Sequence, residues 1–172
     1  MQPQQLFVMS GLPGSGKSTI ADELAKAMRV PVLSIDPIEA AMWASGLPRS
    51  DTGLAAYYVA RAIAAENLRL GQTVIIDAVN PVEAAREMWR SLAAEFDLPV
   101  TFIEVTCSDE EIHEARINAR VRGIPGMSEV TWERVLERKQ EFEPWAGKRL
   151  QLDTSNQDLE SLITQALEYL PL

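Results

Sequence analysis

The sequence predicts an α/β fold, a three-layer sandwich in which a five-stranded parallel sheet carries helices on both faces. Short apolar segments alternate along the chain with longer segments whose apolar residues recur at helical spacing. The short segments are apolar almost throughout, which is typical of parallel strands that are buried on both faces. At 172 residues, the chain is expected to form a single domain over residues 1–172.

The predicted strands are short apolar runs, which occupy residues 5–10, 31–36, 73–77, 99–107 and 148–154. The predicted helices occupy residues 17–29, 37–45, 54–70, 81–96, 108–121 and 129–141, followed by one that runs to about residue 169. Gly71 stops the third of these helices. The stretch "SDEE" at residues 108–111 predicts a capping box in which Ser108 and Glu111 satisfy free amides at a helix start.

The order of these elements predicts where a ligand binds. Right-handed crossovers place the carboxyl ends of all parallel strands at one edge of the sheet, and ligands of such sheets bind at that edge. The edge is expected to gather residues 11–18, Asp36, Asp77 and the segment after Cys107.

A glycine-rich stretch, "GLPGSGKST", lies between the first predicted strand and the first helix. It matches the pattern G-x-x-x-x-G-K-[ST] at every fixed position and in the required context. Glycines let backbone amides wrap around phosphate oxygens, and the helix start adds its positive dipole end. Lys17 is expected to contact the β- and γ-phosphates of ATP, and the Ser18 hydroxyl to bind Mg²⁺. The predicted nucleotide-binding residues here are Gly11, Leu12, Pro13, Gly14, Ser15, Gly16, Lys17, Ser18 and Thr19.

Two aspartates at predicted strand ends favour phosphate transfer to a hydroxyl group over hydrolysis. Asp77 can bind Mg²⁺, but Ala78 follows it, so no neighbouring carboxylate is ready to activate water. Asp36 is predicted to take the proton of the acceptor hydroxyl and, through water, to reach Mg²⁺. Structural roles are the alternatives: Asp36 as the N-cap of a helix with Pro37 at its first position, and Asp77 as a turn residue. The predicted metal-binding residues are Ser18, Asp36 and Asp77.

Three arginines precede or begin a loop that is rich in Gly and Pro. Arg116 and Arg120 are four residues apart and share a helix face, and Arg122 starts the loop. Their guanidinium groups match phosphate oxygens, so we expect residues 114–128 to form a lid that closes over ATP and excludes water. The alternative is a solvated helix face. The predicted catalytic residues are Lys17, Asp36 and Arg120, and Arg116 and Arg120 are predicted to bind the nucleotide.

The composition limits the possible partners. A net charge of −9 argues against a protein that coats nucleic acid, although a pocket for one nucleotide needs only a few cations. A single cysteine, Cys107, allows no intrachain disulfide. The sequence has neither a signal-peptide pattern nor an apolar run long enough to span a membrane, so a soluble, cytoplasmic protein is expected.

These residues together resemble the P-loop kinases of the small-molecule and polynucleotide 5′-hydroxyl type, which include gluconate, shikimate, chloramphenicol and zeta-toxin kinases. The resemblance is carried by "GLPGSGKST", "SID", "VIIDAVNPVEAAREMW", "RINAR" and "EFEP", in this order. It implies that Asp36 is the base, that Arg116 and Arg120 are lid residues, and that "DTS" at residues 153–155 lies near the adenine. One position departs from the polynucleotide kinases. They carry an arginine that grips the substrate's phosphate three residues after the base, where this chain has Glu39.

The sequence therefore predicts an ATP- and Mg²⁺-dependent kinase of a small hydroxyl compound. A polynucleotide 5′-hydroxyl kinase and a nucleotide-dependent regulatory or toxin-like ATPase are the alternatives. The acceptor and the oligomeric state are not predicted. His113 is expected at the surface, Cys107 and Trp89 in the core, and Tyr57, Arg61, Arg49, Trp43, Trp132 and Trp145 are open between packing and acceptor binding.

Overall fold

The computed structural model describes residues 4–169 and confirms the α/β fold. Its single sheet has five parallel strands in the order β2-β3-β1-β4-β5. The strands are β1 (Leu6–Ser10), β2 (Val32–Ser34), β3 (Val74–Asp77), β4 (Val100–Thr106) and β5 (Leu150–Asp153). β1 lies in the centre, so the loop that follows it emerges in the middle of the carboxyl edge.

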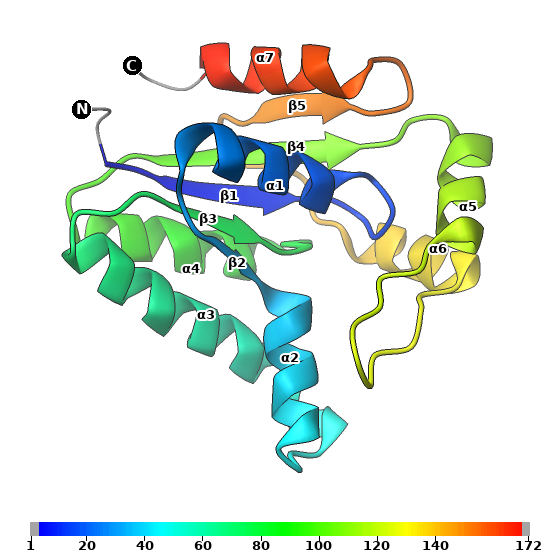
Figure 1. Ribbon diagram of the computed structural model, residues 1–172, viewed down its shortest axis with the longest axis horizontal. Coiled ribbons are helices and arrows are strands. Elements are labelled where there is room, and N and C mark those ends of the chain that lie inside the picture. Colours follow the sequence, from blue (N-terminus) through cyan, green and yellow to red (C-terminus); the bar gives the residue numbers. More distant parts are fainter. Residues whose placement is uncertain (1–3, 170–172) are drawn as a thin grey trace.

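Helices cover both faces of the sheet, as the sequence predicted (Figure 1). α1 (Lys17–Met28) and α7 (Leu159–Tyr169) lie on one face, and α3 (Thr52–Arg69) and α4 (Glu83–Ala94) lie on the other. α2 (Ile35–Ala44), α5 (Glu110–Ala119) and α6 (Trp132–Glu141) lie beyond the carboxyl ends of the strands. A short 3₁₀ turn, Arg49–Asp51, precedes α3. Within residues 4–169, we find no helix with both the length and the apolar character needed to cross a membrane.

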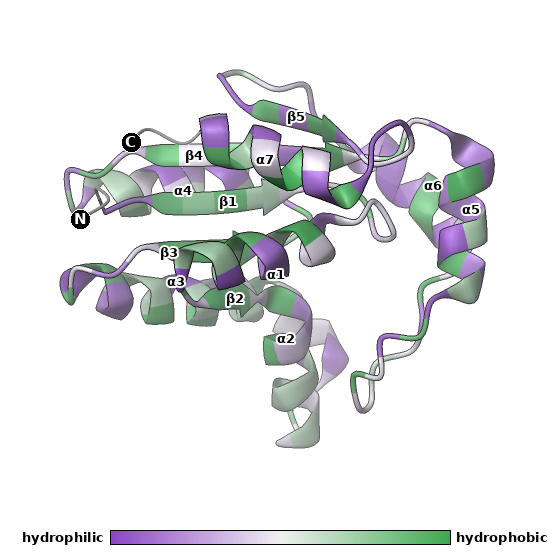
Figure 2. Cartoon of the chain, turned by 45° about the horizontal axis from the view of Figure 1, so that its top comes forward, coloured by the Kyte–Doolittle hydropathy of each residue, from purple (hydrophilic) through white to green (hydrophobic). Residues whose placement is uncertain are grey.

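The central strand explains the near-continuous apolar pattern. Leu6 and Val8 pack with α3 and α4, whereas Phe7 and Met9 pack with α1 and α7. All four side chains are at most 1% exposed. Figure 2 shows β1 and β4 as largely hydrophobic, while helices such as α1 and α7 carry both hydrophobic and hydrophilic residues. Both faces of the strand are thus dry, which is why no polar residue alternates along it.

The second strand ends earlier than predicted. α2 begins at Ile35 with Ser34 in the N-cap position, so Asp36 lies in the first helical turn. The predictions that Asp36 ends a strand or caps the helix were therefore wrong. Pro37 is tolerated in the same turn because the first amides of a helix have no intrahelical acceptor. The Asp36 carboxylate remains at the carboxyl edge of the sheet.

The lid segment also differs from its prediction. The N-cap of α5 is Asp109, whose carboxylate accepts a hydrogen bond from Ile112 N at 3.0 Å, so the capping box at Ser108 was wrong. α5 ends at Ala119, and residues 120–131 form an irregular loop before α6, which Thr131 caps. As predicted, residues 114–128 pass from a helix into a loop, but the helix ends at Ala119 rather than near residue 121. We call residues 120–131 the lid loop.

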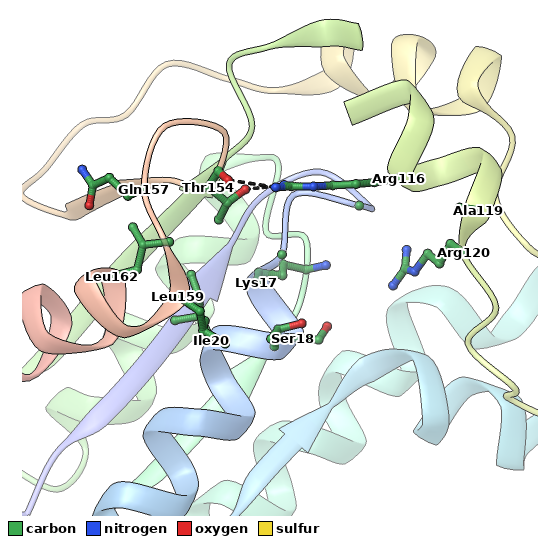
Figure 3. A pocket seen from close by; sticks show the side chains of 13 residues that line it. Lys17, Ser18, Ile20, Arg116, Ala119, Arg120, Thr154, Gln157, Leu159 and Leu162 are labelled. Carbon is green, nitrogen blue, oxygen red and sulfur yellow. Dashed lines mark hydrogen bonds between the residues drawn. The ribbon is translucent and has the colours of Figure 1, made fainter. Parts of the chain in front are cut away.

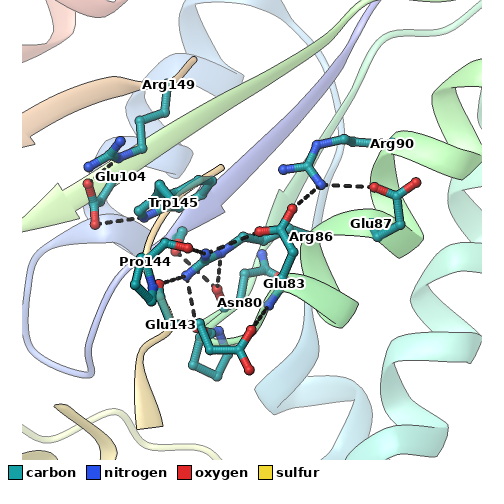
Figure 4. Close-up of polar contacts among 12 residues, drawn as sticks. Asn80, Glu83, Arg86, Glu87, Arg90, Glu104, Glu143, Pro144, Trp145 and Arg149 are labelled. Atoms are coloured by element: carbon teal, nitrogen blue, oxygen red, sulfur yellow. Dashed lines mark hydrogen bonds and ion pairs between the residues drawn. The ribbon is translucent and has the colours of Figure 1, made fainter. Parts of the chain in front are cut away.

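A buried arginine joins two distant segments behind the site (Figure 4). Arg86 on α4 is fully buried and donates to the carbonyls of Asn80, Pro81, Glu143 and Pro144 at 2.8–3.1 Å. Its guanidinium also lies 4.0 Å from the centre of the Trp145 ring. This clamp explains why "VIIDAVNPVEAAREMW" and "EFEP" occur together, and it fixes the chain that leaves α6. Truncation of Arg86 would deprive four carbonyls of a donor, and a buried acceptor left unsatisfied commonly costs about 1–3 kcal/mol.

Candidate active site

The glycine-rich loop, residues 11–16, approaches its neighbours too closely for side chains at two positions. A Cβ on Gly11 would lie 2.2 Å from the carbonyl oxygen of Val105 on β4, at a φ of +149°. A Cβ on Gly14 would lie 2.6 Å from Ile117 Cδ1 on α5, at a φ of +79°. Only glycine meets both demands without strain. The loop is thus pressed between the central strands and α5.

Two carbonyl groups of this loop accept hydrogen bonds from side chains in other segments of the protein. His113 on α5 donates from Nε2 to Pro13 O at 2.8 Å, and the Thr154 hydroxyl donates to Ser15 O at 2.7 Å. In the described part of the chain, the amides of Gly14, Gly16 and Lys17 have no protein acceptor. The amides therefore stay available for an anion in front of the loop.

His113 is buried, which contradicts its expected place at the surface. It is only 4% exposed, and its ring contacts the edge of Trp132 at 5.1 Å between centroids. Burial lowers the pKa of His113 below its ordinary value. The sequence gave no local signal for this role, because the loop carbonyl that His113 holds lies a hundred residues away.

A cavity of about 490 Å³, which we call the loop cavity, lies in front of the glycine-rich loop (Figure 3). Lys17, Ser18, Arg116 and Arg120 line its polar part, and Ile20, Leu159 and Leu162 line its apolar part. This division suits a ligand with an anionic end and an apolar end. Thr154 lines it too, whereas Asp153 accepts hydrogen bonds from Ser108 and Ser155, and these lower its pKa.

The two predicted lid arginines differ in what they contact. Arg116 donates to the hydroxyl and the carbonyl of Thr154 at 2.6 and 2.8 Å, so it is anchored to the end of β5. Arg120 follows the end of α5, and its Nη1 is buried without a hydrogen-bond partner in the described chain. Burial and the nearby Arg122 lower the pKa of Arg120. Lys17 is 6% exposed and has no ion-pair partner among residues 4–169. Lys17, which is buried, and Arg120, which is half-buried, are thus cations without an ion-pair partner among residues 4–169.

Ser18 and Asp77 meet as the sequence predicted for a metal site, but Asp36 is placed elsewhere. Asp77 Oδ2 accepts hydrogen bonds from the hydroxyls of Ser18 and Ser34 at 2.8 and 2.9 Å. Asp77 Oδ1 is buried and has no partner in the described residues. These oxygens suit Mg²⁺ with bound water. Because residues 4–169 contain no cluster of three or more metal-ligating side chains, such an ion would need water and phosphate oxygens as further ligands.

A second cavity, of about 200 Å³, lies under the lid loop, and we call it the lid cavity. Lys17 and Arg120 line both the loop cavity and the lid cavity. Asp36 also lines the lid cavity, where its Oδ2 accepts a hydrogen bond from Arg122. The structure therefore puts Asp36 on the far side of Lys17 and Arg120 from the loop cavity.

Several residues that the sequence left open are assigned by their contacts. Trp43 and Arg49 line the lid cavity, with the guanidinium 4.1 Å from the ring centre. Arg61 pairs with Glu95, and Trp145 donates to Glu104, so both are engaged away from the lid cavity. Cys107 and Trp89 are buried, as predicted. Sequence reasoning missed Arg138, which lines the lid cavity from α6, because nothing in a charged helix distinguishes one arginine from another.

The pH dependence of stability tests the burial of His113. Because the pKa is lowered in the folded state, protonation favours unfolding, and stability falls as the pH drops below about 6.5. A single histidine contributes at most about 1.4 kcal/mol per pH unit. The free energy of unfolding in urea should fall less between pH 7.5 and 5.5 in His113→Gln, which keeps an N–H donor. Identical pH dependence in the two proteins would show that His113 is not held neutral.

Comparisons with known proteins agree with this geometry. A stretch of 107 residues, 62% of the chain, is 30% identical to the bifunctional polynucleotide phosphatase/kinase of Schizosaccharomyces pombe, and it spans only 22% of that protein. A candidate kinase from Chloroflexus aurantiacus J-10-fl superposes with a TM-score of 0.78 at 22% identity, over 99% of this chain and 100% of that one. A sugar kinase from Janibacter sp. HTCC2649 superposes with a TM-score of 0.71 at 20% identity, over 97% of this chain and 94% of that one. At these identities the two structures establish a shared fold.

A family model also covers most of the chain. The model described as an AAA domain, AAA_33, matches residues 6–145. The match includes the glycine-rich loop, both aspartates and the lid loop. The chain therefore belongs to the AAA_33 family, and it shares its fold with the two kinases above.

Proposed function

We propose that this protein transfers the γ-phosphate of ATP to a hydroxyl group of a small molecule, with Mg²⁺ as cofactor. One observation carries the proposal: the loop cavity and the lid cavity meet at Lys17 and Arg120, two cations that have no ion-pair partner among residues 4–169. A phosphoryl group that moves from one cavity to the other would pass between them. Nucleotide phosphates would bind the loop amides, and the acceptor would bind in the lid cavity.

The residues on the two sides of this junction supply complementary chemistry. The acceptor oxygen forms a bond to the γ-phosphorus while the bond to the bridging oxygen of ADP breaks, and Asp36 accepts the hydroxyl proton. Lys17 and Arg120 stabilise the charge on the transferred group. Mg²⁺, held by Ser18 and through water by Asp77, would neutralise phosphate charge when bound. Arg122 holds Asp36 Oδ2, and Oδ1 would then accept the hydroxyl proton.

The lid loop is positioned to exclude water. Arg49 donates to Gly126 O at 2.6 Å, which joins the turn before α3 to the lid loop. Arg122, in the same loop, contacts Asp36 and lies 3.7 Å from Glu129. Exclusion of water favours transfer to the acceptor over hydrolysis of ATP.

A polynucleotide 5′-hydroxyl kinase is the second candidate, because the S. pombe relative acts on polynucleotides by its name. Two features weaken it. Glu39 lines the lid cavity where a substrate phosphate would bind, and the chain has a net charge of −9. A regulatory or toxin-like ATPase would bind ATP without phosphorylating a metabolite.

A substrate panel separates these candidates. The protein is incubated with γ-labelled ATP and Mg²⁺ in the presence of hydroxyl metabolites, nucleosides, antibiotics or a 5′-hydroxyl oligonucleotide. Mass detection of a phosphorylated small molecule is the expected result. Label on the oligonucleotide alone would support the polynucleotide kinase, and release of phosphate without any labelled product would support an ATPase.

The variant Asp36→Asn tests the proposed base. It keeps the shape of the side chain but removes the proton acceptor, so kcat should fall by about 10²–10⁴-fold while ATP binding stays within about twofold. Asp51→Asn, an exposed aspartate in the 3₁₀ turn nearby, is the matched control and should leave kcat unchanged. An unchanged kcat in Asp36→Asn would exclude Asp36 as the base.

Ser18 and Ser34 both donate to Asp77 Oδ2. Substitution of each serine in turn distinguishes a metal ligand from a hydroxyl with a purely structural role. Ser18→Ala should raise the Mg²⁺ concentration for half-maximal activity by about tenfold or more, because it removes a direct ligand. Ser34→Ala removes the equivalent hydrogen bond and should change this concentration by less than about threefold. The measurement is activity against free Mg²⁺, and equal shifts in both variants would contradict a direct role for Ser18.

A further inference from the structure

The lid cavity continues into a larger space that the mechanism does not use. A cavity of about 510 Å³, which we call the tyrosine cavity, lies between α3 and α4. Asp36, Glu39, Val79 and Arg138 line both the lid cavity and the tyrosine cavity. The two cavities therefore join beside Asp36. Small-molecule sites usually measure about 300–1,000 Å³, so the lid cavity alone is small for an acceptor and the joined space is adequate.

The tyrosine cavity has a mostly apolar wall. Tyr57, Val82, Met88 and two exposed side chains at its rim, Leu54 and Tyr58, line it. Burial raises the pKa of Tyr57 to about 12, so its hydroxyl stays neutral. That hydroxyl accepts a hydrogen bond from Asn80 N at 3.4 Å, and its proton has no acceptor in the described chain. The space suits an apolar body with a polar atom near Tyr57.

Arg138 lies where the lid cavity and the tyrosine cavity join, and it has no ion-pair partner among residues 4–169. The other basic residues of α6 are paired, Arg134 with Glu137 and Lys139 with Glu110, both at 2.7 Å. Arg138 is half-buried and makes no hydrogen bond or ion pair among residues 4–169. A guanidinium in this state gains most from a carboxylate or another planar anion that it can bind through two hydrogen bonds.

The charged side chains that line the lid cavity limit what Arg138 can bind. Apart from Lys17 and Arg120, which face the nucleotide side, the lid cavity contains Arg49, Arg122 and Arg138 against two carboxylates, Asp36 and Glu39. Arg122 is paired with Asp36 and also lies 3.7 Å from Glu129, so its charge is offset, whereas Arg138 has no ion-pair partner among residues 4–169. Glu39 would repel an acceptor that carries several negative charges.

We infer that the acceptor is a hydroxyl compound with one anionic group, a carboxylate, which Arg138 binds, and an apolar body that occupies the tyrosine cavity. Arg138 is then a specificity-determining residue for the transfer. The inference rests on the proposed function, since it names the substrate class of the same site. The acceptor must then have its hydroxyl near Asp36 and its carboxylate near Arg138, where the lid cavity and the tyrosine cavity join. Its apolar part would lie between α3 and α4.

Pairs of ligands that differ only in charge test this inference by binding, without turnover. The probes are ortho-, meta- and para-hydroxymethylbenzoate with the corresponding benzamides, and an aliphatic hydroxy acid with its amide. Affinity is measured by calorimetry or ligand-observed NMR on the full chain with a non-hydrolysable ATP analogue. At least one acid should bind about tenfold or more tightly than its amide, as expected for one charge-assisted hydrogen-bonded contact.

Three variants locate the source of that preference. Arg138→Gln should abolish the difference between acid and amide, while Arg134→Gln, on the same helix and away from both cavities, should retain it. Ala84→Phe, at the exposed rim of the tyrosine cavity, should weaken an acid and its amide equally. Circular dichroism and thermal unfolding confirm that each variant is folded.

The outcomes separate this inference from the proposed function. If no acid binds better than its amide, or if Arg138→Gln keeps the preference, the inference is wrong even where another hydroxyl compound is phosphorylated. If the preference exists and depends on Arg138, but no hydroxyl compound of the panel is phosphorylated, the proposed transfer is wrong and the anion site stands.

Discussion

The attachment of the glycine-rich loop through its carbonyl groups is the constraint on which the site depends. His113 and the Thr154 hydroxyl each take one loop carbonyl, from α5 and from the end of β5. The peptide units of these two carbonyls carry the N–H groups of Gly14 and Gly16, two residues that line the loop cavity and whose amides have no protein acceptor among residues 4–169. The amides are thus oriented before any ligand arrives, and binding need not order them.

This attachment also fixes the position of the arginines. His113 lies on α5, which also carries Arg116 and ends just before Arg120, and Thr154 accepts a hydrogen bond from Arg116. α5 packs so closely that Gly14 has no room for a Cβ beside Ile117. Arg116, from a segment a hundred residues away, is therefore held at the loop cavity. Local positive charge is in this way concentrated in a protein with a net charge of −9.

The segments around the lid cavity are held by two kinds of contact. Arg86 binds four backbone carbonyls and so joins the turn after β3 to the segment after α6. The lid loop is held by charged contacts of Arg122 and Arg49 at the protein surface. Buried hydrogen bonds of the first kind are costly to break, whereas partly exposed ion pairs contribute little to stability. The turn after β3 and the segment after α6 are thus held more firmly than the lid loop.

The sequence by itself determined the fold class, the glycine-rich loop and the meeting of Ser18 with Asp77, because apolar period and strand–loop–helix order are local properties. It placed Asp36 correctly at the carboxyl edge of the sheet, but in a strand rather than in the first turn of a helix. The end of a strand and the start of a short helix look alike in a sequence. Only the tertiary structure decided that His113 is buried against Pro13, that Arg122 holds Asp36, and that Arg138 faces a cavity. Each of these depends on packing between segments far apart in the chain, and charged helices carry no local mark of the face that becomes buried.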